Sequence, residues 1–249
     1  MRAIAKSLVL EAQRIERDVS STLRPLDEFL GAFRSSSVSF IDSASKFLFD
    51  FVSLLCVQEI MRHDLPVVFL DGGNSIDPFI LANLAKRFGV DREHMLSQVH
   101  ISRSFTAYQM STLIGERLED RIQESGAGML VVSCFPALYL DEDLWWPEAL
   151  ELVRQGFSTV RELTKRWNTI TLVTNYKLSN MYRRSALRRL LYTEPDKVVR
   201  FENGVRCIRA VLPREERWMS YVPVAHNQTT LAEYVEDKVY MAAEEPLVR

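Results

Sequence analysis

Basic residues gather in one stretch of the sequence, where they could bind phosphates. Residues 177–214 hold 10 Lys and Arg against 3 Asp and Glu, a local net charge of +7 that leaves −9 for the rest of the chain. Five of these cations are candidate DNA-binding residues: Lys177, Arg183, Arg184, Arg188 and Arg189. Three aromatic side chains stand among them and could stack on bases: Tyr176, Tyr182 and Tyr192. This asymmetry is typical of a nucleic-acid-binding face. The alternative is an amphipathic helix that buries its leucines and turns its cations to solvent or to a partner.

Two adjacent tryptophans, Trp145 and Trp146, end an acidic segment that begins at Tyr139. The three consecutive carboxylates at 141–143 would repel phosphates, which counts against DNA at this place. A tryptophan ring can stack on a base, contact a protein partner or pack in the core. The sequence leaves these three roles open, and we carry both tryptophans as partner-contact candidates.

The sequence does not predict a metal site, a disulfide or a membrane-spanning segment. The three cysteines, Cys56, Cys134 and Cys207, are widely separated and lie in apolar runs, which predicts buried free thiols in a reducing compartment. The four histidines have no i, i+4 partner, so we expect structural roles for them and no metal site. The longest apolar run, residues 47–57, is too short to span a bilayer. No secretion signal is recognisable, which predicts a cytoplasmic protein.

Apolar strands alternate with helices along most of the chain. Strands are expected at 37–41, 66–71, 99–101, 129–133 and 169–174. Helices are expected at 27–31, 47–61, 77–88, 107–123 and 146–167, the first closed by glycine. With 47% hydrophobic and 26% charged residues the 249-residue chain is globular rather than disordered. This alternation predicts an α/β fold with a mostly parallel sheet covered by helices on both faces.

Both ends of the chain differ from this pattern. A helical stripe over residues 3–20 predicts an N-terminal helix. Near the C-terminus, Asn203-Gly204 predicts a two-residue hairpin between strands at 197–202 and 205–211. A last strand near 220–224 and an acidic helix at 230–244 follow. We therefore divide the chain into an N-terminal helix (1–20), a core domain (21–228) and a C-terminal acidic helix or tail (229–249).

Five stretches, in order, resemble motifs of the RecA/RadA recombinase superfamily. Residues 21–31 (STLRPLDEFLG) are similar to its TGxxxLDxLLGG lead-in, and 37–41 (SVSFI) to the strand that feeds its phosphate loop. The run from VVFLD (67–71) to GVD (89–91) resembles VxYIDTEG and the helix after it, and HISRSFTAYQMSTL (100–113) resembles xxARAFxxxQxxxLL. MLVV (129–132) and LVTN (172–175) resemble the Walker B and sensor strands. The resemblance implies a RecA-like core, nearest to recombinase paralogues and KaiC-like proteins.

The same resemblance places the nucleotide site of the family on residues that are partly replaced. A phosphate loop needs glycines, a lysine and a Ser or Thr for Mg²⁺. The corresponding segment here, FIDSASKF (40–47), keeps Lys46 but has no glycine and puts Phe47 in the place of the metal ligand. Gly73 replaces the water-activating Glu, Ser133 the Walker B Asp, and Tyr176 the sensor Gln. The vestigial site would comprise Lys46, Asp71, Ser133 and Asn175.

Phosphoryl transfer depends on positioning and charge stabilisation, so these losses together predict an inactive ATPase without cofactor or metal. In the family, single-stranded DNA contacts loops that correspond to residues 139–147 and 176–192. We expect a catalytically inactive recombinase paralogue, accessory in DNA recombination or repair. It would bind single-stranded DNA or dock on a RecA/RadA-family recombinase or a sister paralogue, in a homo- or hetero-oligomer. The alternatives are an ATP-binding regulatory RecA/KaiC-like module that uses ATP and Mg²⁺ through Lys46, or a purely structural subunit.

Overall fold

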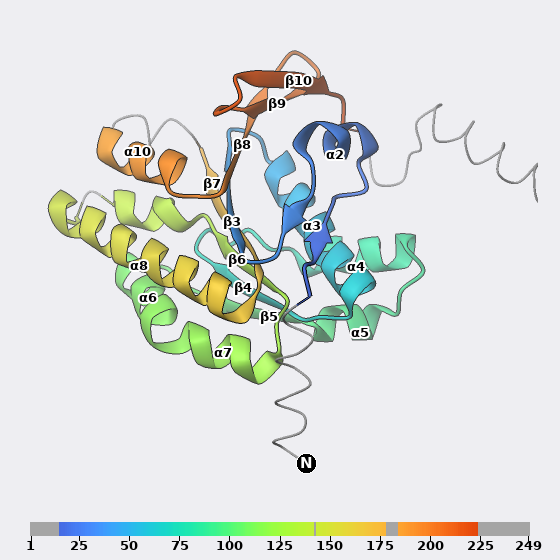
Figure 1. The fold of residues 1–249 in the computed structure, drawn as a ribbon, viewed down its shortest axis with the longest axis horizontal. Coiled ribbons are helices and arrows are strands. Elements are labelled where there is room, and N and C mark those ends of the chain that lie inside the picture. The colour runs from blue at the N-terminus through green and yellow to red at the C-terminus, as the bar shows by residue number, and fades with distance from the viewer. Residues whose placement is uncertain (1–14, 142, 178–183, 224–249) are drawn as a thin grey trace, which may run out of the picture.

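A central eight-stranded sheet organises the computed structural model, which describes residues 15–141, 143–177 and 184–223 (Figure 1). The strand order is β10-β9-β8-β3-β7-β6-β4-β5. The six parallel strands are β3 (Ser37–Ser43), β4 (Val67–Asp71), β5 (Val99–Arg103), β6 (Met129–Ser133), β7 (Ile170–Tyr176) and β8 (Lys197–Asn203). Two antiparallel strands, β9 (Ile208–Leu212) and β10 (Arg217–Tyr221), complete the sheet at one edge.

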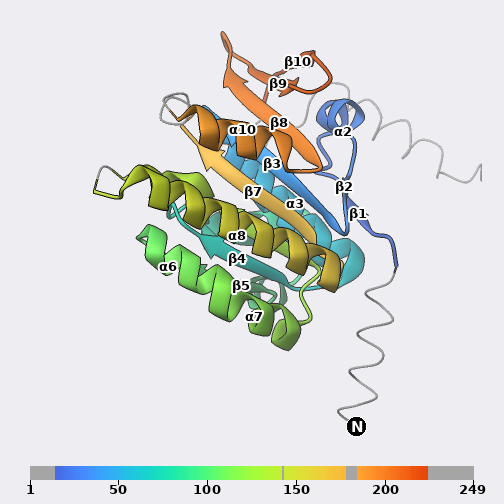
Figure 2. The same ribbon diagram turned by 60° about the vertical axis from the view of Figure 1, so that its left-hand side comes forward.

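Helices cover both faces of the sheet (Figure 2). One face packs against α2 (Arg24–Leu30), α3 (Phe47–His63), α4 (Pro78–Arg87) and α5 (Arg92–Ser97). The other face packs against α6 (Ala107–Thr112), α7 (Leu118–Ser125), α8 (Trp146–Trp167) and α10 (Ser185–Thr193). Each face buries its own apolar cluster, and β4 and β6 are buried along their whole length. The predicted α/β fold with a mostly parallel sheet and a C-terminal hairpin is confirmed.

Four local predictions differ from the structure. Within 15–20 the chain forms a short strand, β1 (Asp18–Val19), paired with β2 (Phe33–Arg34), so the helix predicted there is wrong; residues 1–14 lie outside the described part. The predicted helix over 107–123 is interrupted by a π-helical turn, Leu113–Arg117. The last strand ends at Tyr221, three residues earlier than expected, and the predicted helix at 230–244 lies outside the described residues.

The hairpin loop is the fourth difference. Asn203 pairs with Ile208, so four residues rather than two connect β8 and β9. The Gly204 amide donates to the carbonyl of Cys207 at 2.9 Å, which closes the wider turn. Arg206 adopts a left-handed conformation with φ +59°, which takes it out of the expected strand.

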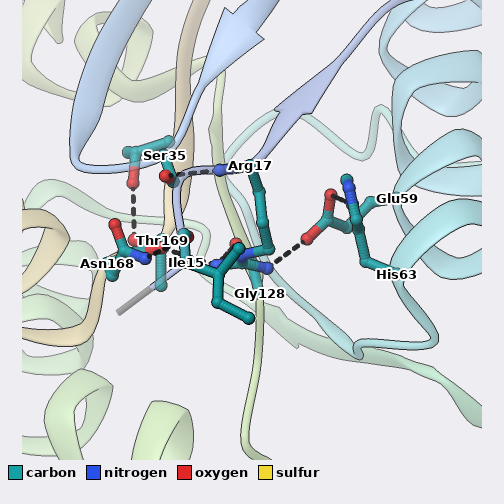
Figure 3. Close-up of polar contacts among 9 residues, drawn as sticks. Ile15, Arg17, Ser35, Glu59, His63, Gly128, Asn168 and Thr169 are labelled. Atoms are coloured by element: carbon teal, nitrogen blue, oxygen red, sulfur yellow. Dashed lines mark hydrogen bonds and ion pairs between the residues drawn. The ribbon is translucent and has the colours of Figure 1, made fainter. Parts of the chain in front are cut away.

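Arg17 holds the segment 15–20 on the amino-terminal edge of the sheet (Figure 3). Its guanidinium donates to Glu59 Oε1 at 2.7 Å and to the carbonyl oxygen of Asn168 at 2.6 Å, while its amide donates to Ser35 Oγ at 3.1 Å. His63 Nδ1 lies 2.8 Å from the other carboxylate oxygen of Glu59. Burial raises the pKa of Glu59 and lowers the pKa of Arg17, because desolvation disfavours the charged form of each side chain. The ion pair therefore forms at a cost in desolvation free energy. This tie explains why the segment is extended rather than helical.

None of the helices within the described ranges combines the length and apolar character needed to cross a membrane.

Candidate functional site

The turn between β3 and α3 corresponds to the phosphate loop of the resemblance, and three of its backbone amides donate to oxygens of the protein. The Ala44 amide donates to the carbonyl of Phe201 at 3.0 Å. The Ser45 amide donates to Ser43 Oγ at 3.0 Å, and the Phe47 amide donates to Ser45 Oγ at 3.3 Å. A phosphate-binding loop needs such amides to point at the ligand. Here these three bind protein oxygens instead.

The ring of Phe47 occupies the place expected for the metal-binding hydroxyl. Its centroid lies 5.3 Å from that of Phe201, 5.6 Å from Tyr221 and 5.9 Å from Phe51, the separations of packed aromatic side chains. The neighbouring Lys46 is exposed at the start of α3. The turn therefore presents one solvated lysine beside an aromatic cluster.

Asp71 and Ser133 meet at the carboxyl edge of the sheet, because β4 and β6 pair with these two residues opposite each other. Asp71 is buried and accepts hydrogen bonds from the Ser75 amide at 2.9 Å, the Ser75 hydroxyl at 2.8 Å and the Gly73 amide at 3.2 Å. Ser75 Oγ lies 2.7 Å from Ser133 Oγ. The side chain of Arg103 approaches the carboxylate at 3.6 Å. Sequence reasoning missed Ser75, although Ser and Asp side chains often form local hydrogen bonds in turns.

The polar chain continues from Ser133 to the next strand. Ser133 Oγ lies 3.2 Å from Thr174 Oγ1, which also accepts the Cys134 amide at 3.0 Å. Cys134 has a left-handed backbone, with φ +53°, and its thiol lies directly under Gly73. A Cβ at position 73 would stand 2.5 Å from Cys134 Sγ. A glutamate at this position would therefore need Cys134 to move.

Asn175 belongs to a second polar group, centred on the buried carboxylate of Asp42. Asn175 Nδ2 donates to Asp42 Oδ1 at 2.8 Å, and the Tyr192 hydroxyl donates to Asp42 Oδ2 at 2.6 Å. Burial raises the pKa of Asp42, although both hydrogen bonds act in the opposite direction. The four residues of the predicted vestigial site thus lie in three places: Asp71 with Ser133, Asn175 with Asp42, and Lys46 in solvent.

The predicted basic face lies on and beside α10. Arg184 stacks over the ring of Trp146 at 4.5 Å, and Arg188 over Tyr192 at 5.4 Å, so both cations are partly engaged within the chain. Lys177 and Arg189 are exposed, and Arg183 lies outside the described residues. Leu187 and Leu191 are buried. The helix is therefore amphipathic, as the alternative prediction required, and it also presents exposed cations.

The two predicted partner-contact residues have different environments. Trp145 is 71% exposed, whereas Trp146 packs against the apolar cluster beneath α8. A hollow of about 180 Å³ near Trp145 is lined in part by Asp141 and Asp143. Packing explains Trp146, whereas Trp145 is exposed and remains a candidate for contact with a partner.

The structure also shows the surroundings of the three cysteines and of the side chains that could bind a metal. Cys56 and Cys134 are buried, with pKa values that burial raises to about 12 and about 11, and Cys207 is half-buried. Among the described residues, no three His, Cys, Asp or Glu side chains come together as a metal site would require. A hollow of about 720 Å³ lies between β5 and the helices α6 and α7, at the opposite edge of the sheet from the hairpin.

The parallel sheet, the helices on both its faces and the C-terminal antiparallel strands define a RecA-like core. The Rad51 family model matches residues 53–188, which is more than half of the chain. The chain therefore belongs to the Rad51 family, within the RecA/Rad51 recombinase superfamily. The match begins inside α3, after the turn that carries Lys46.

Proposed function

We propose that this recombinase-related chain is a catalytically inactive accessory in DNA recombination or repair, which binds DNA or docks on a recombinase. One observation carries the proposal: the amides of Ala44, Ser45 and Phe47 donate to protein oxygens in the turn where the family binds phosphates. Turnover is not required of an accessory protein, so a closed nucleotide site is compatible with this role.

The free-energy cost of reopening this turn supports the proposal. Each amide would first have to release its protein acceptor, at a cost of about 1 kcal/mol, before it could donate to a phosphate oxygen. A bound Mg²⁺ would find the Phe47 ring at the ligand position and the Ser133 hydroxyl engaged with its neighbours Ser75 and Thr174. The residues of this turn therefore do not fit a magnesium-bound nucleotide.

The DNA-binding arm of the proposal depends on the cations around α10. Lys177 and Arg189 are exposed. Arg184 and Arg188 are stacked on aromatic rings, but they keep their charge and still contribute to the positive electrostatic potential of this face. Exposed arginines and lysines supply most of the affinity for a nucleic-acid backbone.

The first experiment measures nucleotide and DNA binding by the full chain. Calorimetry with ATP and Mg²⁺ should detect no saturable binding, and no phosphate should be released. A labelled oligothymidylate should bind, and should bind more weakly when Arg183, Arg184, Arg188 and Arg189 are changed together to alanine. Arg92→Ala, an exposed arginine on the opposite face of the sheet, serves as the control for loss of charge.

Each outcome selects among the candidate functions. ATP binding that is lost in Lys46→Ala would favour a nucleotide-binding regulatory module and reject the inactive-accessory proposal. Absence of both ATP and DNA binding would leave docking on a protein, tested by affinity purification from the native organism. Recovery of a recombinase by mass spectrometry supports the accessory role, and recovery of an unrelated complex favours a structural subunit.

A further inference from the structure

The hairpin strands β9 and β10 extend the sheet beyond α10 (Figure 1, Figure 2). On one face they bury Ile208, Ala210 and Leu212 against the cluster that includes α3. Alternate residues of a strand point to opposite faces, so Arg209 and Trp218 point to the face that carries α10. Both are exposed, and the Trp218 side chain is 60% exposed.

Arg209 and Trp218 form a stacked pair on neighbouring strands. The guanidinium carbon of Arg209 lies 4.8 Å from the centroid of the Trp218 ring. Glu202 on β8 approaches Arg209 only at 3.9 Å, and the Arg209 side chain stays 50% exposed. An exposed indole beside an exposed guanidinium combines a stacking surface with a positive charge.

Arg214 connects this pair to α10. It lies between β9 and β10 and donates from Nε and Nη2 to the carbonyl oxygen of Tyr192 at 3.0 and 2.9 Å. Because Tyr192 is in the last turn of α10, this contact holds the hairpin beside the helix that carries Arg189. The exposed cation of α10 and the Arg209–Trp218 pair therefore lie on the same side of the sheet.

Edge-strand protection does not account for the charge of Arg209, since Arg209 lies on β9, which pairs with a strand on each side, whereas β10 is the edge strand. Nor does it explain Trp218, because a large apolar ring exposed at a sheet edge promotes association rather than preventing it. Proteins that bind single strands combine a positive surface with aromatic rings on which bases stack.

We propose that Trp218 is a base-stacking site for single-stranded nucleic acid, with Arg209 beside it and Arg189 on the same side of the sheet as contacts for the phosphates. The binding face then runs from α10 across the outward side of β8 to β10. This inference rests on the DNA-binding arm of the proposed function, and adds to it a site that lies outside the two loops of the family.

The test compares variants of the full chain by fluorescence anisotropy with a labelled oligothymidylate of about 15 nucleotides. Trp218→Ala should weaken binding about 5- to 150-fold, the equivalent of losing one stacked base. The slope of the salt dependence should stay unchanged, because no charge is removed. Arg209→Ala should instead reduce that slope by about 0.7. Trp218→Phe keeps an aromatic ring and should recover most of the affinity, which separates stacking from folding.

Phe79→Ala is the control, since Phe79 is an exposed aromatic side chain on α4, at the opposite face of the sheet, and its loss should leave DNA affinity unchanged. If the parent binds the oligonucleotide and folded Trp218→Ala binds it equally well, this inference is overturned while the DNA-binding function stands. If the parent does not bind, the DNA-binding arm fails and the stacking site fails with it. If Trp218→Ala weakens binding to duplex DNA but not to the oligothymidylate, the assignment to single strands is overturned.

Discussion

The hydroxyl of Tyr192 donates a 2.6 Å hydrogen bond to the buried carboxylate of Asp42, 150 residues earlier in the chain. Tyr192 lies on α10 and Asp42 on β3, so this bond fixes the basic helix to the centre of the sheet. Asn175 donates to the second oxygen of the same carboxylate. β3, which corresponds to the strand before the phosphate loop in the family resemblance, carries near its end the carboxylate that anchors α10.

Tyr192→Phe should therefore destabilise the fold by about 1.5–3 kcal/mol, because it removes a hydrogen bond to a buried charged group. Its effect should depend on pH. The pKa of Asp42 is raised in the folded state, so ionised Asp42 opposes folding as pH rises through that pKa. Losing the Tyr192 bond raises this pKa further. Urea unfolding should show a larger penalty at a pH well above the raised pKa of Asp42 than at about pH 4, near the ordinary pKa of an aspartate.

The control for that measurement is Tyr108→Phe. Tyr108 also donates to a carboxylate, Glu148, at 2.7 Å, but both side chains are on the surface. Its removal should change stability little and without a comparable pH dependence. Equal penalties at both pH values for Tyr192→Phe would contradict the assigned role of Asp42.

Gly128 offers a second prediction, about the Arg17–Glu59 ion pair. A Cβ built at Gly128 clashes with Arg17 Nη1 and with Glu59 Oε1, and lies 2.7 Å from the Cβ of Leu65. Gly128→Ala should cost about 1–3 kcal/mol in chemical unfolding, because the pair must shift to admit a methyl group. Gly115→Ala has open space around its Cβ and should be neutral or slightly stabilising. If Gly128→Ala leaves the free energy of unfolding unchanged, the Arg17–Glu59 pair can shift without cost and the prediction is wrong.

The sequence predicted well what depends on local pattern. Continuous apolar runs identified β4 and β6, and the glycine after α2, with φ +68° at Gly31, marked the end of that helix. These features follow from periodicity and residue type within a few positions. The missing glycines around Lys46 were instead recognised through the family resemblance.

What depends on contacts distant in sequence could not be predicted. The stripe at 3–20 has helical spacing, yet Arg17 reaches Glu59 and the carbonyl of Asn168, and these bonds favour an extended segment at Asp18–Val19. Asn203-Gly204 has the preferred composition of a two-residue turn, but the Gly204–Cys207 bond closes a longer one. In both cases tertiary or medium-range hydrogen bonds outweighed a local preference.

The three thiols should differ in reactivity. Burial raises the pKa of Cys56 to about 12 and of Cys134 to about 11, so both are almost entirely protonated and shielded at about pH 8. Cys207 is half-buried in the hairpin loop. A disulfide reagent should label one thiol rapidly in the native protein and three after denaturation. The rapid phase should vanish in Cys207→Ser, and rapid labelling of two or more thiols would contradict the buried positions.

The cations on and beside α10 should separate into two kinds by their effects on stability and on DNA binding. Arg189 is exposed, and Lys177 is exposed with only a distant contact, 5.9 Å, to the Tyr176 ring. Their alanine variants should unfold like the parent, while each lowers the salt-dependence slope of oligothymidylate binding by about 0.7. Arg184 is stacked on Trp146, and its loss removes an intramolecular contact as well as a charge. Arg184→Ala should therefore also lower the midpoint of thermal unfolding.

Arg184→Lys distinguishes the two contributions, because it keeps the charge and loses the planar group that stacks best on an indole. It should keep the salt slope of the parent and show most of the stability loss of Arg184→Ala. If Arg189→Ala leaves the salt slope unaltered, Arg189 makes no phosphate contact, and the bound oligonucleotide does not pass over it. The comparison therefore tests whether the basic face contacts phosphates with those side chains that the fold leaves exposed.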